Sequence, residues 1–123
     1  MMRWVAVLAA GAIFMLPDAP RAQTFPERTV RIVIPFGPSG GNDIVARVLA
    51  TKLSETVGQP VIVDNRPGGQ GMLAGEIVMR APPDGHTLLM GPSGTMTANP
   101  AVYTKMPYHP QRDFSPVTMI GSF

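Results

Sequence analysis

Three turns rich in glycine hold the residues whose types and spacing favour a chemical role. They span residues 37–41, 66–76 and 91–95, and each comes after a short apolar run. In an open α/β sheet such turns lie at the carboxyl edge of the strands, where ligands bind, and the unpaired N–H groups of a helix that begins there suit an anion. One such turn commonly serves only chain reversal, but three at equivalent positions predict a binding site.

The first turn also contains a candidate nucleophile. Residues 37–41 match Gly-x-Ser-x-Gly, the pattern of a serine hydrolase elbow, and lie between a predicted strand and a predicted helix. His86 and His109 follow, with Asp84 and Asp113 as acids that could orient them. The elbow would lie on the first strand of the mature chain, however, and no oxyanion loop precedes it. A serine hydrolase is therefore kept only as the alternative.

The composition argues against several other kinds of site. The chain has 123 residues, no cysteine, two histidines and a formal net charge of +2, so neither a metal-ligand cluster nor a basic nucleic-acid surface is predicted. Residues 69–74 read Gly-x-Gly-x-x-Ala, which stays open as a weak form of the dinucleotide fingerprint. We expect no metal, no cofactor, no nucleic acid and no catalytic residue.

Short apolar runs predict the strands of a mostly parallel sheet. They cover residues 30–35, 61–63, 87–90 and 117–120. The first run is polar only at Arg31, which suits a strand covered on both faces. Because helical patterns separate the first three runs, the order of elements predicts an α/β fold.

Two helical patterns connect these strands. In the first, Asn42 is the predicted N-cap and Gly58 the predicted end. The apolar positions of this helix recur at helical spacing and are expected to face the core. Those positions are Ile44, Val45, Val48, Leu49 and Leu53. The second pattern covers residues 72–80, and one further helical turn is expected at 98–103, with Pro100 at its first position.

The first 22 residues have the pattern of a secretory signal peptide. Arg3 forms a short basic start, residues 4–16 form an apolar run, and Ala22 is the predicted last residue before cleavage. Pro20 departs from the small residue expected at its position. The apolar run is short for a membrane span, which needs about 20 residues, so an uncleaved anchor is the lesser alternative.

Five segments of the chain together resemble one protein family. They are P-F-x-P-x-G-G-x-D at 35–43, G-Q-P-V-x-V-x-N-R-P-G at 58–68, A-P-P-D-G-x-T-L-L at 81–89, N-P-A-x-Y at 99–103 and D-F-x-P-V at 113–117. With this set the chain is similar to the Bug, or TctC-like, extracytoplasmic receptors of tripartite tricarboxylate transport systems. The resemblance covers essentially all of residues 25–122.

The resemblance implies an architecture and a location. Members of the family are periplasmic binding proteins with two α/β lobes around a cleft and a hinge between the lobes. Residues 23–123 would then be the N-terminal portion of the first lobe of a type II-like periplasmic-binding-protein domain, truncated near the hinge. Residues 1–22 would be removed on export to the periplasm. A non-functional truncated fragment is a further alternative.

The resemblance also implies a ligand and partners. Members bind small carboxylates, including di- and tricarboxylates and polar amino acids, largely through loop backbone and ordered water. The membrane subunits of a tripartite tricarboxylate transporter are the implied protein partners. By resemblance, the ligand-binding residues are Pro38, Ser39, Gly40, Gly41, Asn42, Asp43, Gly68, Gly69, Gly71, Ser93, Gly94 and Thr95. The Asp43 carboxylate is expected to turn back onto helix N–H groups or to meet an ammonium group of the ligand.

Overall fold

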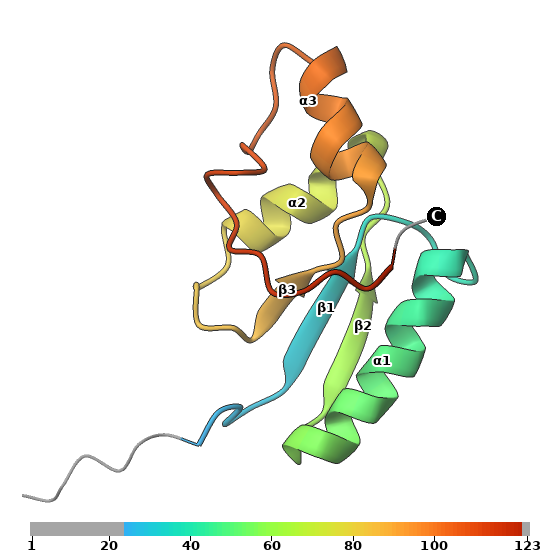
Figure 1. Cartoon of the computed structure of the whole chain (residues 1–123), viewed down its shortest axis with the longest axis vertical. Coiled ribbons are helices and arrows are strands. Elements are labelled where there is room, and N and C mark those ends of the chain that lie inside the picture. Colours follow the sequence, from blue (N-terminus) through green and yellow to red (C-terminus); the bar gives the residue numbers. More distant parts are fainter. Residues whose placement is uncertain (1–23, 122–123) are drawn as a thin grey trace, which may run out of the picture.

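A parallel three-stranded sheet organises the chain. The computed structural model describes residues 24–121, so the predicted signal peptide lies outside the described residues. Strands β1 (Val30–Ile34), β2 (Val61–Asn65) and β3 (Thr87–Leu89) lie in the order β2-β1-β3, and β1 pairs in parallel with both neighbours (Figure 1). The predicted α/β fold with a parallel sheet is therefore confirmed. No helix within the described range is long and apolar enough to cross a membrane.

Strand β1 is covered on both faces, as its unbroken apolar run predicts. Val30, Ile32 and Ile34 belong to a buried cluster with Ala46, Ala50 and Val61. Because side chains alternate along a strand, Val33 points to the opposite face, and it too is fully buried. Both faces of the central strand therefore exclude water.

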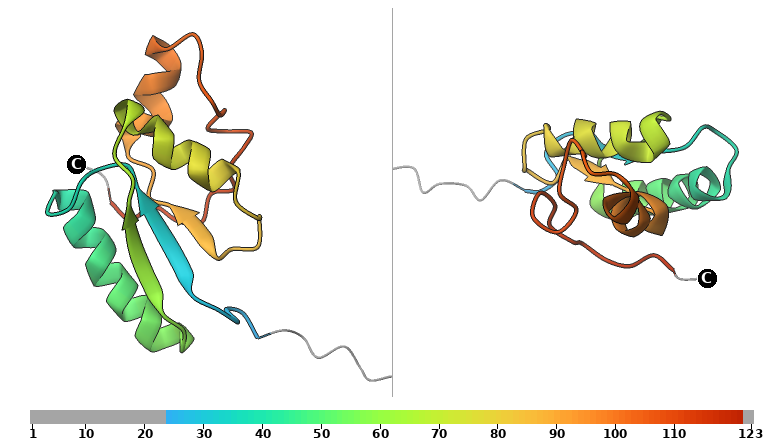
Figure 2. Two further views of the ribbon diagram at one scale, coloured as in Figure 1. Left: turned by 180° about the vertical axis from the view of Figure 1, so that it is seen from behind. Right: turned by 90° about the horizontal axis from the view of Figure 1, so that it is seen from above.

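One helix covers each face of the sheet. Helix α1 (Gly41–Val57) follows β1, and helix α2 (Met72–Met79) follows β2 after a short 3-10 turn at Gly69–Gly71. Figures 1 and 2 show α1 and α2 on opposite sides of the strands. After β3 come a π-helical turn, Gly94–Ala98, and a short helix α3, Asn99–Val102, which confirms the expected helical turn near Pro100.

The prediction that the large apolar side chains of α1 face the core is wrong. The residues of α1 that are buried are Asp43, Ala46 and Ala50, so the helix lies against the sheet through small side chains. Four of the five predicted core residues are exposed: Ile44 by 59%, Val45 by 39%, Val48 by 61% and Leu53 by 38%. Helix α1 therefore has apolar residues on two sides, and small side chains form the buried side because they let the helix approach the strands closely.

The ends of α1 agree with the prediction at one terminus only. Gly58 has φ +71°, in the left-handed region that glycine favours, and its N–H donates to the Ser54 carbonyl at 3.1 Å. At the other end the helix begins at Gly41, so the N-cap is Gly40 and not Asn42. Asn42 lies inside the first turn, where its side chain makes no capping hydrogen bond.

The predicted fourth strand is absent from the described residues. Residues 117–120 have no strand or helix assignment, and Val117, Met119 and Ile120 are exposed by 78, 78 and 51%. Figure 1 shows this segment, in red, crossing in front of the sheet without joining it. A strand requires a neighbour for its N–H and C=O groups, and this apolar run pairs with none in the described part of the chain.

Candidate ligand-binding site

The three glycine-rich turns gather at one edge of the sheet. Because the strands are parallel, their carboxyl ends all point to the upper edge in Figure 1, and the turns lie there. An open pocket of about 340 Å³ lies among these turns. Its lining residues are Pro35, Phe36, Gly37, Pro67, Gly68, Gln70, Gly71, Gly94, Thr95 and Asn99. The prediction that the turns meet at one edge is confirmed.

Gly71 is the point where β1 and the second and third turns touch. A Cβ atom at position 71 would lie 2.5 Å from Thr95 Oγ1 and 3.1 Å from Pro35 Cβ, and Gly71 has φ +85°. Both the space and the left-handed backbone therefore require glycine. The close approach makes Gly71, Thr95 and Pro35 one continuous patch of the pocket wall.

A second link joins the same two turns. Asn99 Nδ2 donates a hydrogen bond to the Gln70 carbonyl at 2.9 Å. Gln70 has φ +56°, a left-handed conformation that is unusual for a residue with a side chain. Asn99 is 9% exposed, so this bond is shielded from water. The bond holds the backbone of the second turn in an orientation that the residue type alone does not favour.

Asp43 closes the first turn onto the end of β2. Its Oδ2 accepts hydrogen bonds from the Ser39 N–H and from Arg47 Nε, both at 2.9 Å, and its Oδ1 accepts one from Asn65 Nδ2 at 3.0 Å. Asn65 Nδ2 also donates to the Phe36 carbonyl at 3.1 Å. The carboxylate does turn back onto a backbone N–H, as expected, but onto Ser39, which precedes the helix.

These partners change the acidity of Asp43. The Arg47 guanidinium, the Ser39 N–H and the Asn65 amide all stabilise the charged form, and they hold the pKa of the Asp43 carboxyl far below its usual range against the opposing effect of burial. The carboxylate thus stays ionised, and both of its oxygens accept hydrogen bonds from other groups of the protein. Its role in this structure is to position the first turn.

Replacing Asp43 with asparagine is expected to lower the melting temperature at neutral pH. A carboxyl whose pKa is lowered by folding adds stability that is fully present above its unfolded pKa, about 3.9, and that is lost as the pH falls toward the folded value. The melting temperatures of the natural chain and the Asp43→Asn variant should therefore differ most above about pH 5 and draw together as the pH falls below about 4. Glu55→Gln, which removes an exposed partner of Lys52, is the control and is expected to change little. A gap for Asp43→Asn that stays constant with pH would contradict the ion-pair explanation.

The structure brings some predicted site residues to the pocket and leaves others beside it. Those that line the pocket are Gly68, Gly71, Gly94 and Thr95. Those that do not line it are Pro38, Ser39, Gly40, Gly41, Asn42, Asp43, Gly69 and Ser93. The first turn reaches the pocket through its earlier residues, because Asp43 draws the later part of that turn toward β2.

Several lining residues escaped the sequence analysis. Pro35, Phe36 and Asn99 line the pocket but lie outside the three turns, whereas Gly37, Pro67 and Gln70 lie within these turns but were not named individually. Asn99 carried a signal, since it opens the N-P-A-x-Y segment directly before a proline at a helix start. Gln70 carried none, because its contribution depends on a backbone angle.

Among residues 24–121 no charged side chain lines this pocket, so the polar partners that these residues offer are backbone groups, a hydroxyl and two amides. Arg66, at the end of β2, donates from Nε to Asp64 Oδ1 at 2.8 Å.

A larger hollow of about 660 Å³ lies between α1 and β2, bordered by Arg47 and Ile62 among others, and none of the predicted binding residues lines it. Among the described residues no group of three or more histidine or acidic side chains is arranged to hold a metal ion.

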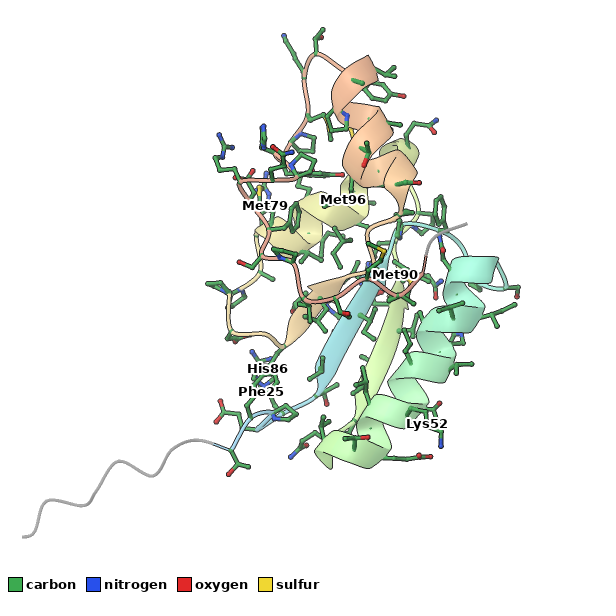
Figure 3. All side chains as sticks on the ribbon, viewed as in Figure 1. Phe25, Lys52, Met79, His86, Met90 and Met96 are labelled. Atoms are coloured by element: carbon green, nitrogen blue, oxygen red, sulfur yellow. The ribbon has the colours of Figure 1, made fainter. Side chains whose placement is uncertain are left out.

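The residues proposed for a hydrolase do not assemble. Ser39 has φ +71° and follows the carboxyl end of β1. His86 is 5% exposed and lies at the amino end of β1, where its carbonyl accepts the Arg31 N–H at 2.8 Å and its ring packs edge-on against Phe25 (Figure 3). Asp113 accepts the His109 N–H at 2.7 Å and pairs with Arg112. Within residues 24–121 no histidine forms a hydrogen bond with Ser39. His86 lies at the amino edge of the sheet, whereas Ser39 follows the carboxyl end of β1.

The proteins that resemble the chain include one relative from a Pseudomonas species and two solved structures from Rhodopseudomonas palustris. The UPF0065 protein of the tcbD–tcbE intergenic region of a Pseudomonas species is 41% identical over 119 residues, which are 94% of this chain and 35% of that protein. The structure of MatC from Rhodopseudomonas palustris with bound malate is 45% identical and superimposes with a TM-score of 0.73 over 76% of this chain and 32% of its own. A second R. palustris protein, solved with adipate, is 40% identical with a TM-score of 0.68, over 71% of this chain and 29% of its own.

The chain thus spans about a third of the length of the proteins that it matches. The sequence profile of the tripartite tricarboxylate transporter family receptor, TctC, matches residues 45–123. That family consists of solute receptors and not of enzymes. The matched range covers more than half of the chain and includes the second and third turns of the pocket. By this match the chain belongs to the tripartite tricarboxylate transporter receptor (TctC) family.

Proposed function

We propose that this chain supplies one wall of the binding cleft of an extracytoplasmic receptor for a small carboxylate. The observation that carries the proposal is the pocket at the carboxyl edge of the sheet, where Gly71, Thr95 and Asn99 join two turns into a wall. Such an edge is where open α/β sheets bind ligands. Of the residues first expected to bind, we retain Gly68, Gly71, Gly94 and Thr95 in direct contact with the ligand.

The chemistry of the wall suits a carboxylate bound without a formal ion pair. Glycine exposes backbone N–H groups to a ligand, and the Thr95 hydroxyl can donate as well. Charged hydrogen bonds from neutral N–H donors to a carboxylate are shorter and stronger than those between neutral groups. The bound malate and adipate of the two similar structures support a carboxylate ligand for this chain too.

The remainder of the cleft is proposed to come from further chain. Residues 23–123 would form the N-terminal portion of the first lobe, and the second lobe would follow beyond a hinge. The length of the relatives, about three times that of this chain, supports this arrangement. The free edges of β2 and β3 also support it, because sheet edges left open in a soluble protein invite further pairing.

The proposed setting is the periplasm. The pattern of residues 1–22 supports export with removal of the leader after Ala22. The family match supports delivery of the bound carboxylate to the membrane subunits of a tripartite tricarboxylate transporter. N-terminal sequencing of the secreted protein tests the export step, and a mature protein that begins at Met1 would overturn it.

Calorimetry on the intact receptor tests the function. The intact receptor means this chain together with the further chain that is proposed to complete the cleft. We expect saturable binding of at least one of malate, succinate, citrate and aspartate. Ser39→Ala is expected to keep that binding, because Ser39 does not line the pocket. Esterase turnover or fluorophosphonate labelling that Ser39→Ala abolishes would overturn the receptor proposal in favour of a hydrolase.

A further inference from the structure

Thr95 and Asn99 present two polar groups on one side of a helical segment. They are four residues apart across the π-helical turn and the start of α3, and both line the pocket. Residues at this spacing lie on the same face of a helix. The third turn therefore offers the ligand a hydroxyl and a side-chain amide from a single surface.

Among the described residues, the side-chain amide of Asn99 has a hydrogen-bond partner for its NH2 group and none for its oxygen. Its Nδ2 donates to the Gln70 carbonyl at 2.9 Å, which fixes how the amide is turned. Its Oδ1 accepts no hydrogen bond from the described residues. This oxygen is not fully enclosed by the protein, so a ligand can reach it. Asn99 is only 9% exposed and forms part of the pocket wall, so its remaining accessible surface opens to the pocket. A carbonyl oxygen can only accept a hydrogen bond.

We propose that Asn99 determines the specificity of this half of the cleft, with Oδ1 accepting a hydrogen bond from a donor on the ligand. The proposal rests on the proposed carboxylate receptor and refines its substrate class. The ligand would be a carboxylate that carries a hydrogen-bond donor, a hydroxyl or an ammonium group, within reach of Asn99. A carboxylate oxygen cannot satisfy Oδ1, because both atoms are acceptors. A ligand without a donor would give Oδ1 no hydrogen bond of its own and would leave this oxygen to water.

The two similar structures hold dicarboxylates of two kinds. One holds malate, which carries a hydroxyl group beside a carboxyl group, and the other holds adipate, which carries none. Pockets on one fold therefore accept dicarboxylates with and without a donor. No charged side chain of the described residues lines this pocket. Charge on this wall therefore cannot discriminate between dicarboxylates that carry a donor and those that do not. A fixed acceptor can.

The test compares malate with succinate, its analogue without the hydroxyl, by calorimetry on the intact receptor. We expect malate to bind about tenfold more tightly than succinate, the value of one hydrogen bond. In Asn99→Leu, which keeps the size of the side chain but not the acceptor, the ratio of the two affinities is expected to fall to about one. Aspartate is the second arm: a preference for aspartate over succinate assigns the donor to an ammonium group, and a preference for malate assigns it to a hydroxyl group.

The ratio separates specificity from a structural role. Loss of the bond to Gln70 would loosen the turn and weaken both ligands together, which leaves the ratio unchanged. Val102→Ala, on the same short helix with a side chain 72% exposed, is the matched control and is expected to keep both affinities. Equal affinities for malate, aspartate and succinate in the natural receptor, or an unchanged ratio in Asn99→Leu, would overturn this inference and leave the carboxylate receptor standing. Failure of all tested carboxylates to bind would overturn both.

Discussion

Replacing Gly75 with alanine is expected to destabilise the fold strongly, because α2 has no room for the added methyl group. A Cβ atom there would lie 2.5 Å from Tyr108 Cζ and closer still to Cε1. The Tyr108 ring cannot easily move, because it is 4% exposed, packs edge-on against Phe114 and donates a hydrogen bond to the Thr95 carbonyl at 3.4 Å. We expect a loss of about 2–3 kcal/mol in the free energy of unfolding, measured by denaturant titration.

Gly41→Ala is the matched control for this experiment. Gly41 is also helical, at the start of α1, but a Cβ atom at that position would meet nothing within 4 Å. Alanine favours a helix over glycine by about 1 kcal/mol, so Gly41→Ala is expected to leave stability unchanged or slightly raised. Gly75→Ala gains the same helical preference, and a variant as stable as Gly41→Ala would show that Tyr108 does not pack against α2 as described.

The second large effect is expected from Gly71→Ala, on ligand binding. The added methyl group would collide with Thr95 Oγ1 and press on Pro35 Cβ, and the backbone would have to leave φ +85° or bear a strain of about 1–2 kcal/mol. Either response displaces Thr95, so the pocket wall loses its continuity. We expect the affinity of the intact receptor for its carboxylate to fall by about a hundredfold or more in calorimetry, as small misplacements of binding groups can cost that much.

Gly69→Ala separates the collision from the backbone strain. Gly69 has φ +55°, so alanine is strained there as well, but its Cβ atom would meet only Met72 Cβ, at an ordinary 3.8 Å. We expect Gly69→Ala to lower the melting temperature while most of the ligand affinity remains. Equal losses of affinity in the two variants would mean that strain alone, and not the contact with Thr95, governs the pocket.

The sequence predicts the parts of this fold that follow from local rules. The apolar run at 30–35 identified β1 because a strand covered on both faces tolerates few polar residues. Gly58 marked the end of α1 because few other residues adopt the left-handed conformation. The same local rules placed the three glycine turns after parallel strands, and this placement located the pocket edge.

The parts that the sequence did not predict depend on contacts between distant residues. Helix α1 has apolar side chains on two sides, and periodicity cannot tell which side meets the sheet; the small Ala46 and Ala50 do. Asp43 and Asn65 meet across 22 positions, and that bond turns Ser39 and Asp43 away from the pocket lining. The run at 117–120 has the composition of a strand, but in the described part of the chain it pairs with neither edge strand, β2 or β3.

The absence of charged side chains from the pocket wall has a consequence for how a ligand arrives. Long-range attraction between a receptor and an anion depends on cationic groups near the site, and dissolved ions screen it over about 8 Å at physiological ionic strength. This wall contributes no such attraction. A carboxylate bound at this wall would therefore make no ion pair with the lining side chains, so added salt would weaken no direct charge contact between the ligand and this wall.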